Sequence, residues 1–386
     1  MGLNDASEWG IKFGFGVSAR TFLLNSQEAV LLPDSPRLTT NNFDLLRLLF
    51  AGTVCLVHAY QLSEYQPLAW IDSVLSTRVA VEAFFVVSGF LIFMSYERSS
   101  SNTTYASKRI RRIYPAYFVA VMLCAVGLLG VSSNSVTDYF TVSWVGYVVA
   151  NLSFLNFFQH TLPGVFETNP VNTVNGALWT LKIEVMFYLS VPLFVMLFRR
   201  FGTLAVLAIA YVGSISYVVL FAWLAEKTGD SVYLRLGRQL PGQLSFFCAG
   251  AFFYYQLKFF ERWAGYFLAG AILVLIFDSY WLFPLFEPFA LATVVIFFAL
   301  FFYLGNFGKY GDFSYGIYIL HFPVLQVFVH YGWLADDPWL YLAAGALTTL
   351  VMAVAMWHLV EKRFLLRSSH YVSASRSPVE KGGDPK

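Results

Sequence analysis

Long apolar runs constrain this chain more than any other feature of its sequence. The hydrophobic residues, 58% of the total, gather in continuous stretches rather than in amphipathic stripes. A helix needs about 20 mainly apolar residues to cross a hydrocarbon layer about 30 Å thick. Charged residues make up only 12% of the chain, about half the share that is usual in soluble domains. The sequence therefore predicts an all-α, polytopic membrane protein.

Ten runs are long enough to span the bilayer, and an eleventh, at 142–158, is borderline. The ten are 43–62, 79–96, 113–130, 177–198, 203–224, 241–258, 264–281, 284–304, 312–331 and 339–360. Loops rich in Lys and Arg stay in the cytoplasm, and basic residues occur after the second, fourth, sixth and tenth runs, whereas residues 131–177 contain none. About ten transmembrane helices with both termini in the cytoplasm satisfy all these markers. We therefore interpret 142–158 as an interfacial or re-entrant segment on the outer face.

The spans belong to one expected domain, residues 42–365. Residues 1–41 are expected to form an N-terminal cytoplasmic extension, and residues 366–386, rich in Ser, Gly, Pro and charge, a disordered cytoplasmic tail. The net charge of +2 gives no indication of a nucleic-acid partner. Cys55, Cys124 and Cys248 all fall within apolar runs and are expected to be small buried hydrophobic residues, so neither a disulfide framework nor a metal site is indicated.

Ionisable residues inside the spans are the best functional candidates, because hydrocarbon penalises a charge at a helix centre by roughly 2.5–3.5 kcal/mol on insertion scales. They are Asp44, Arg47, His58, Glu82, Lys182, Glu184, His321 and Glu361.

Arg47 and His58 are eleven residues apart in the first run. At about 100° per residue they point the same way, about 16 Å apart along the helix. Asp44, three residues before Arg47, shares that face and can pair with it. Taken alone, His58 can be a satisfied interior histidine and Arg47 a snorkelling cation. Together they predict the wall of a polar passage, with His58 in the outer half of the membrane.

Two further groups of charges allow alternative interpretations. Lys182 and Glu184 are two residues apart, so they point to different faces and need partners elsewhere, and Glu82 is one candidate partner for Lys182. Arg109 and Arg112, three residues apart at the start of a helix, are either part of a cytoplasmic anchor or a clamp on a single anionic group.

Six short motifs are spread along the spans. The first is Asn42–Arg47 followed by His58, and the others lie at 81–92, 109–116, 178–188, 311–323 and 360–362. Over about residues 42–365, these motifs and their order resemble those of the acyltransferase 3 family of bacterial membrane O-acyltransferases, and the first is similar to the Arg-x10-His element of that family. Thr180 and Lys182 depart from the usual fourth motif.

The resemblance implies transfer of an acyl group, most often acetyl, from cytoplasmic acyl-CoA to a sugar hydroxyl of a cell-surface glycan or its lipid-linked precursor. It implies a multi-pass protein of the bacterial inner membrane, with acyl-CoA, the glycan acceptor and the bilayer as partners and no metal. It assigns His58, Arg47 and Glu184 to catalysis, and Arg109 and Arg112 to the CoA phosphates. The further candidate pocket residues are Asp44, Glu82, Trp179, Lys182, Ser314, Tyr315 and His321.

The residue types suit this chemistry. A thioester is already activated, so the sugar hydroxyl is the partner that needs a base, and neutral imidazole can take its proton. Arg47 cannot act as a base but can bind phosphate or counter negative charge on the thioester oxygen. The alternative function is a transporter or flippase with an intramembrane Arg/His/Glu pathway, although the chain lacks the repeated halves common in transporters.

Overall fold

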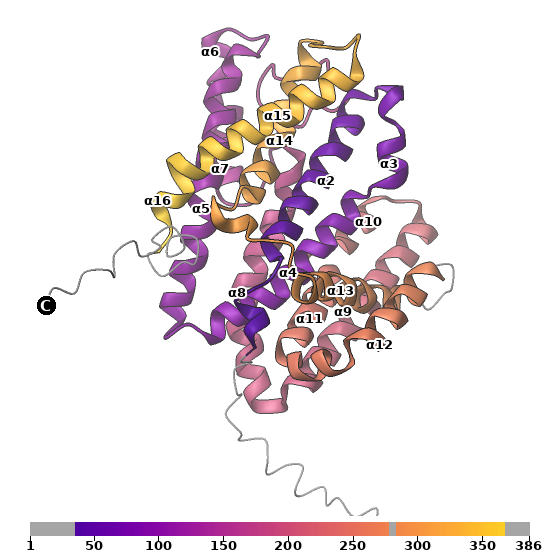
Figure 1. Cartoon of the computed structure of the whole chain (residues 1–386). Coiled ribbons are helices and arrows are strands. Elements are labelled where there is room, and N and C mark those ends of the chain that lie inside the picture. The colour runs from indigo at the N-terminus through magenta and orange to yellow at the C-terminus, as the bar shows by residue number, and fades with distance from the viewer. Residues whose placement is uncertain (1–34, 278–282, 367–386) are drawn as a thin grey trace, which may run out of the picture. The chain divides into compact units, whose positions relative to one another are not determined.

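The computed structural model describes residues 35–277 and 283–366, and all regular secondary structure in these ranges is helical, as predicted (Figure 1). Most of the expected extension (1–41) and nearly all of the expected tail (366–386) lie outside the described residues. The cytoplasmic placement of both termini therefore stays a prediction.

Each of the ten predicted runs forms a helix. They are α2 (Phe43–Ser63), α4 (Thr77–Glu97), α5 (Asn102–Gly127), α8 (Trp179–Phe201), α9 (Thr203–Thr228), α11 (Leu240–Tyr255), α12 (Leu257–Ile276), α13 (Phe283–Phe301), α14 (Ser314–His330) and α15 (Pro338–Met356). Within the described ranges, however, only eight helices are long and apolar enough to cross a membrane.

The two that fall short are α11 and α14, with 16 and 17 residues. At 1.5 Å per residue they are roughly 24 and 26 Å long, less than a hydrocarbon layer of about 30 Å. Both are enclosed by protein, and every residue from Ser314 to Gln326 of α14 is buried. Hydropathy in the sequence cannot distinguish a short helix enclosed by its neighbours from a full span, and for this reason ten were predicted. The borderline run 142–158 forms α7 (Val142–Leu152), whose 11 residues are too few to span.

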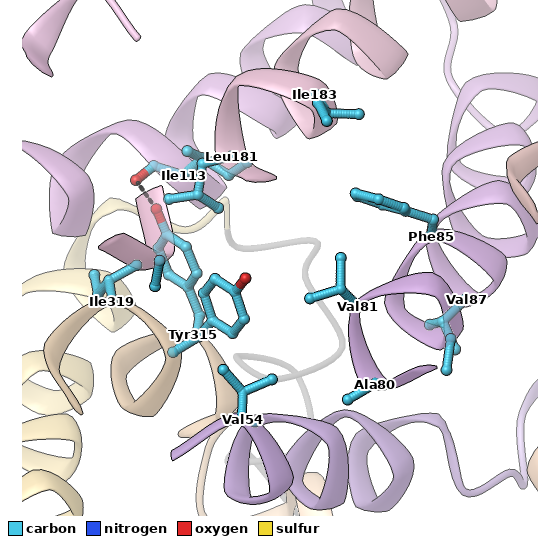
Figure 2. Close-up of a cluster of buried hydrophobic side chains, with 14 of the residues drawn as sticks. Val54, Ala80, Val81, Phe85, Val87, Ile113, Leu181, Ile183, Tyr315 and Ile319 are labelled. Carbon is cyan, nitrogen blue, oxygen red and sulfur yellow. Dashed lines mark hydrogen bonds between the residues drawn. The ribbon is translucent and has the colours of Figure 1, made fainter. Parts of the chain in front are cut away.

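The helices pack around α2, α4 and α14. Helix α14 packs against α2 and α15, α4 packs against α2 and α11, and α11 also contacts α9 and α13 (Figure 1). Figure 2 shows Val54 of α2, Val81 of α4, Leu181 of α8 and Tyr315 of α14 directed toward one another. All four are buried. The Tyr315 hydroxyl also donates to the Ile113 carbonyl of α5 at 3.0 Å, so this core joins five helices.

The prediction that the three cysteines are buried is confirmed. Cys55, Cys124 and Cys248 are free and buried.

Glycines set the contact between α4 and α11. A Cβ atom added to Gly89 would lie 2.0 Å from the Phe247 carbonyl oxygen, and one added to Gly250 would lie 2.0 Å from the Val86 carbonyl oxygen. Membrane helices associate closely where small residues let their backbones approach. No side chain fits at either position, so this crossing fixes how near α4 comes to α11.

We expect Gly250→Ala to lower the midpoint of thermal unfolding of the protein in detergent, because overpacking costs about 1–3 kcal/mol or more where backbone must move. Gly213→Ala in α9 is the matched control, since a Cβ there meets nothing within 4 Å. Equal midpoints for the two variants would show that the glycine contact does not hold the helices together.

Candidate active site

A buried carboxylate joins two arginines from different helices. Asp312, just before α14, accepts hydrogen bonds from Arg47 of α2 and Arg112 of α5. Arg112 also pairs with Glu361 at 3.1 Å. Asp312 is only 3% and Glu361 only 2% exposed. The network therefore links α2, α5, the start of α14 and the segment that follows α15.

Local structure places both carboxylates. Asp312 accepts from the Ser314 backbone N–H at 3.1 Å and from the Ser314 hydroxyl, which fixes it at the N-terminus of α14, where the helix dipole favours negative charge. Glu361 ends a π-helical turn, η7 (Trp357–Glu361), whose two end residues are both buried. Such wide turns are frequent at functional sites.

Beside this network lies a cavity of about 100 Å³, which we call the Arg47 cavity. Polar groups of its wall come from α2, α4, α5, α8 and α14: Arg47, Ser88, Arg109, Arg112, Thr180, Glu184, Tyr188, Ser314, Tyr315 and Tyr318. Three guanidinium groups and one carboxylate line the wall, and Asp312 and Glu361 pair with two of these guanidinium groups, Arg47 and Arg112. Arg109 forms no ion pair with a described residue, so it is the group of the wall that favours an anion.

The two arginines of the predicted clamp line the same cavity but differ in their partners. Arg112 is held by Asp312 and Glu361. Arg109 donates from Nη2 to the Ser95 hydroxyl at 3.0 Å, and its Nε is buried without a hydrogen-bond partner among the described residues. Arg109 therefore keeps a donor available for a ligand. Glu184, opposite in charge, accepts from the Tyr188 hydroxyl at 2.5 Å.

His58 is part of a pair of histidines. Its Nδ1 lies 2.8 Å from Nε2 of His321, and the two rings stack with centroids 5.1 Å apart. His321 is 0% exposed, and its Nδ1 lies 3.0 Å from the Ile317 carbonyl oxygen. The contact joins α2 to α14.

This geometry fixes where the protons lie when both rings are neutral. A carbonyl oxygen can only accept, so Nδ1 of His321 carries a hydrogen and its Nε2 carries the lone pair. Nδ1 of His58 must then donate to that lone pair. Nε2 of His58 is left unprotonated, which is the form that can accept a proton from a substrate.

The structure separates the predicted polar passage into two parts. Arg47 lines the cavity, whereas His58 does not and lies half-buried against His321. Tyr318 belongs to both parts, since it lines the cavity and its ring centroid is 6.0 Å from that of His321. Sequence reasoning found Arg47 and His58 but did not single out Tyr318 or Asp312. The signal for Asp312 was an Asp two residues before a Ser at the start of an apolar run.

The proposed pairing of Lys182 with Glu82 is wrong. Lys182 donates to Gln239 Oε1 at 2.6 Å, and Glu82 pairs with Arg78 at 3.0 Å. Of the further candidates, Ser314 and Tyr315 line the Arg47 cavity, whereas Asp44, Glu82, Trp179, Lys182 and His321 do not. Glu82 follows Val81 by one residue, about 100° around α4, so it faces away from that cavity.

Comparison with known proteins gives consistent matches over most of the chain. A protein-family profile described as an acyltransferase domain matches residues 40–358. Nodulation protein 10 of Rhizobium leguminosarum bv. viciae is 28% identical over 83% of this chain and 92% of its own length. The O-acetyl transferase of Shigella phage Sf6 is 28% identical over 86% of this chain and 98% of its own length. The peptidoglycan O-acetyltransferase OatA of Listeria monocytogenes serovar 1/2a is 26% identical over 32% of this chain and 20% of its own length. No solved structure matches the chain significantly.

We expect Asp312→Ala to destabilise the fold by roughly 3–5 kcal/mol, because it leaves two buried guanidinium groups without their shared partner. Thermal unfolding in detergent measures the effect, and Asp336→Ala, at an exposed loop position, is the control. If both variants unfolded at the wild-type temperature, the Asp312 network would have no structural role.

Proposed function

This chain belongs to the acyltransferase 3 family and is a membrane O-acyltransferase, and we propose that it transfers an acyl group, in the simplest case acetyl, from acyl-CoA to a sugar hydroxyl. The observation that carries the proposal is the His58–His321 pair, which presents an unprotonated imidazole nitrogen inside the helical bundle. The names of two relatives support acetyl as the group and a hydroxyl as the acceptor.

The Arg47 cavity is the proposed donor site. Its three arginines suit the phosphates of CoA, and Arg109 has a donor, Nε, that no group of residues 35–277 and 283–366 uses. A volume of about 100 Å³ holds only a few water-sized groups. The cavity therefore takes one phosphate at the head of the pantetheine arm, and the nucleoside stays outside it, at the cytoplasmic face that the basic residues near Arg109 indicate.

The residues divide the reaction as follows. Nε2 of His58 takes the proton of the acceptor hydroxyl as the hydroxyl oxygen attacks the thioester carbonyl carbon. The carbon–sulfur bond then breaks, the sugar ester forms, and the CoA thiolate leaves and takes up a proton. His321 positions His58 and holds its tautomer. Arg47 lies about 16 Å from His58 along α2 and binds a phosphate of the donor in the cavity, and Glu184 is the supporting acid of the site.

The donor must reach the histidine pair from the cavity. Tyr318, which lines the cavity and contacts His321, marks the route we propose for it. The acceptor, a surface glycan or its lipid-linked precursor at the bacterial inner membrane, is proposed to approach His58 from the other face. The alternative function, a transporter or flippase, is not favoured, because relatives that match nearly their full length include a named transferase.

We expect His58→Ala to lower acyl transfer by about 10²–10⁴-fold, the usual contribution of a positioned general base. Release of CoA and labelling of the acceptor by purified protein in lipid nanodiscs measure the effect. His58→Ala with wild-type turnover would remove this residue from the mechanism.

Two variants of His321 test whether this residue positions His58. His321→Leu removes the acceptor for the Nδ1 hydrogen of His58, so we expect kcat to fall by about 10²-fold, with a shifted pH profile. His321→Gln keeps an acceptor at that place and should recover part of the activity. Equal losses in both variants would point to packing alone.

We expect Arg109→Ala to raise the KM for acyl-CoA by about 10-fold, because a charge-assisted hydrogen bond to phosphate contributes roughly 1.5–3 kcal/mol. Arg111→Ala, two residues away and exposed, is the matched control. An unchanged KM in the Arg109 variant would contradict the donor-site assignment.

A further inference from the structure

A second charged cavity lies at the N-terminal end of α4. It has a volume of about 220 Å³ and is formed by α4, α9, α11, α13 and the short helix α10 (Val232–Gly237). We call it the Arg78 cavity. Arg78 is in the first turn of α4, whereas the α4 residues that line the Arg47 cavity run from Val81 to Ile92. The two cavities therefore follow each other along α4, on different faces of the helix.

The charges of the Arg78 cavity balance. Two arginines, Arg78 and Arg238, line it together with two glutamates, Glu82 and Glu287. Arg78 joins both glutamates, at 3.0 Å to Glu82 and 2.7 Å to Glu287. The Arg47 cavity offers the guanidinium of Arg109 to an anion, whereas this cavity offers hydrogen-bonding groups whose charges cancel. Such a wall fits an uncharged ligand with many hydroxyl groups.

One amide oxygen in this wall lacks a partner among the described residues, although the nitrogen of the same amide, Nε2 of Gln243, donates to the Arg238 carbonyl oxygen at 3.5 Å. Gln243 of α11 lines the cavity and is 8% exposed, and its Oε1 is buried without a hydrogen bond to any described residue. A buried acceptor left unpaired is costly, by about 1–3 kcal/mol. A ligand hydroxyl that donates to Oε1 removes this cost. This observation is independent of the charged groups and points to a ligand.

The cavity also lies at the depth of His58. Phe43 contacts Phe90 with ring centroids 5.1 Å apart, and Phe50 contacts Phe84 at 5.4 Å, so α2 and α4 run antiparallel in a fixed register. His58 follows Phe50 by eight residues along α2, so the same register places His58 beside the first turn of α4. Arg78 belongs to that turn. The cavity and the imidazole therefore lie at a similar depth in the bundle, as a ligand of more than one ring that occupies the cavity and presents a hydroxyl to His58 requires.

We propose that the Arg78 cavity is a subsite for a neutral saccharide unit of the acceptor, separate from the unit whose hydroxyl reacts. The inference rests on the proposed acyl transfer to a sugar, and adds that the acceptor has at least two units and that the unit bound here carries no charge. Gln243, Glu82 and Glu287 accept from its hydroxyls, and Arg238 donates.

The test uses the full-length protein in lipid nanodiscs and a panel of disaccharides. The panel contains neutral members (hexose, deoxyhexose and N-acetylhexosamine) and acidic members (uronate), and binding is followed by ligand-observed NMR titration. We expect neutral members to bind the wild type, and Gln243→Leu to weaken the tightest of them about fivefold, the effect of one neutral hydrogen bond. Gln256→Leu, at the other end of α11, is the control and should bind as the wild type does.

Two readouts separate a binding role from a structural one. Gln243→Leu removes an unsatisfied buried acceptor, so its unfolding midpoint should stay equal or rise while saccharide binding falls. Glu287→Gln gives the wall a net positive charge and should shift preference toward the uronate members. The subsite is overturned if no panel member binds the wild type, or if Gln243→Leu binds as tightly. Failure of the proposed function would appear separately, as the absence of Arg109-dependent acyl-CoA binding in the same nanodiscs.

Discussion

The carboxylate of Asp312 is the constraint on which the candidate active site depends. It lies between the guanidinium groups of Arg47 and Arg112, and Arg112 is shared with Glu361. Charges this deep in an apolar bundle persist only when they are paired and hydrogen-bonded. Because the partners come from four separate segments, their pairing sets the position of α2 against α14. That same placement brings His58 to His321.

Helix α4 lies between the Arg47 cavity and the Arg78 cavity. Val81, Phe84, Phe85 and Ser88 line the Arg47 cavity, whereas Arg78 and Glu82 line the Arg78 cavity. The glycine crossing with α11 leaves this helix no room to move toward its neighbour. On the proposed function, α4 therefore stands between the donor site and the subsite that we propose for the acceptor.

The sequence predicted the class of fold and several residues of the candidate site, but not the residues with which these side chains pair. Apolar run length located all ten helices, since the cost of exposing backbone in lipid leaves helices as the natural solution. It overcounted full spans because enclosure of α11 and α14 by protein depends on tertiary packing. The helical period placed Arg47 and His58 on one face of α2. The period relates residues within a single helix, however, and does not show which other helix they contact. The partners Asp312 and His321 come from a segment more than 250 residues away, and no local pattern reports such a contact. The same limit explains the wrong partner for Lys182.

Because α14 is short, the Arg47 cavity and the histidine pair lie close together along its axis, and this affects how an acyl group can be carried across a membrane. Its first residue, Ser314, lines the Arg47 cavity, and His321 follows seven residues later, about 10 Å along the axis. On the proposed function, a flexible thioester arm covers that interval by itself. The protein then needs no alternation between inward-open and outward-open states. Only the acyl unit changes compartment, and the two substrates never share an aqueous channel.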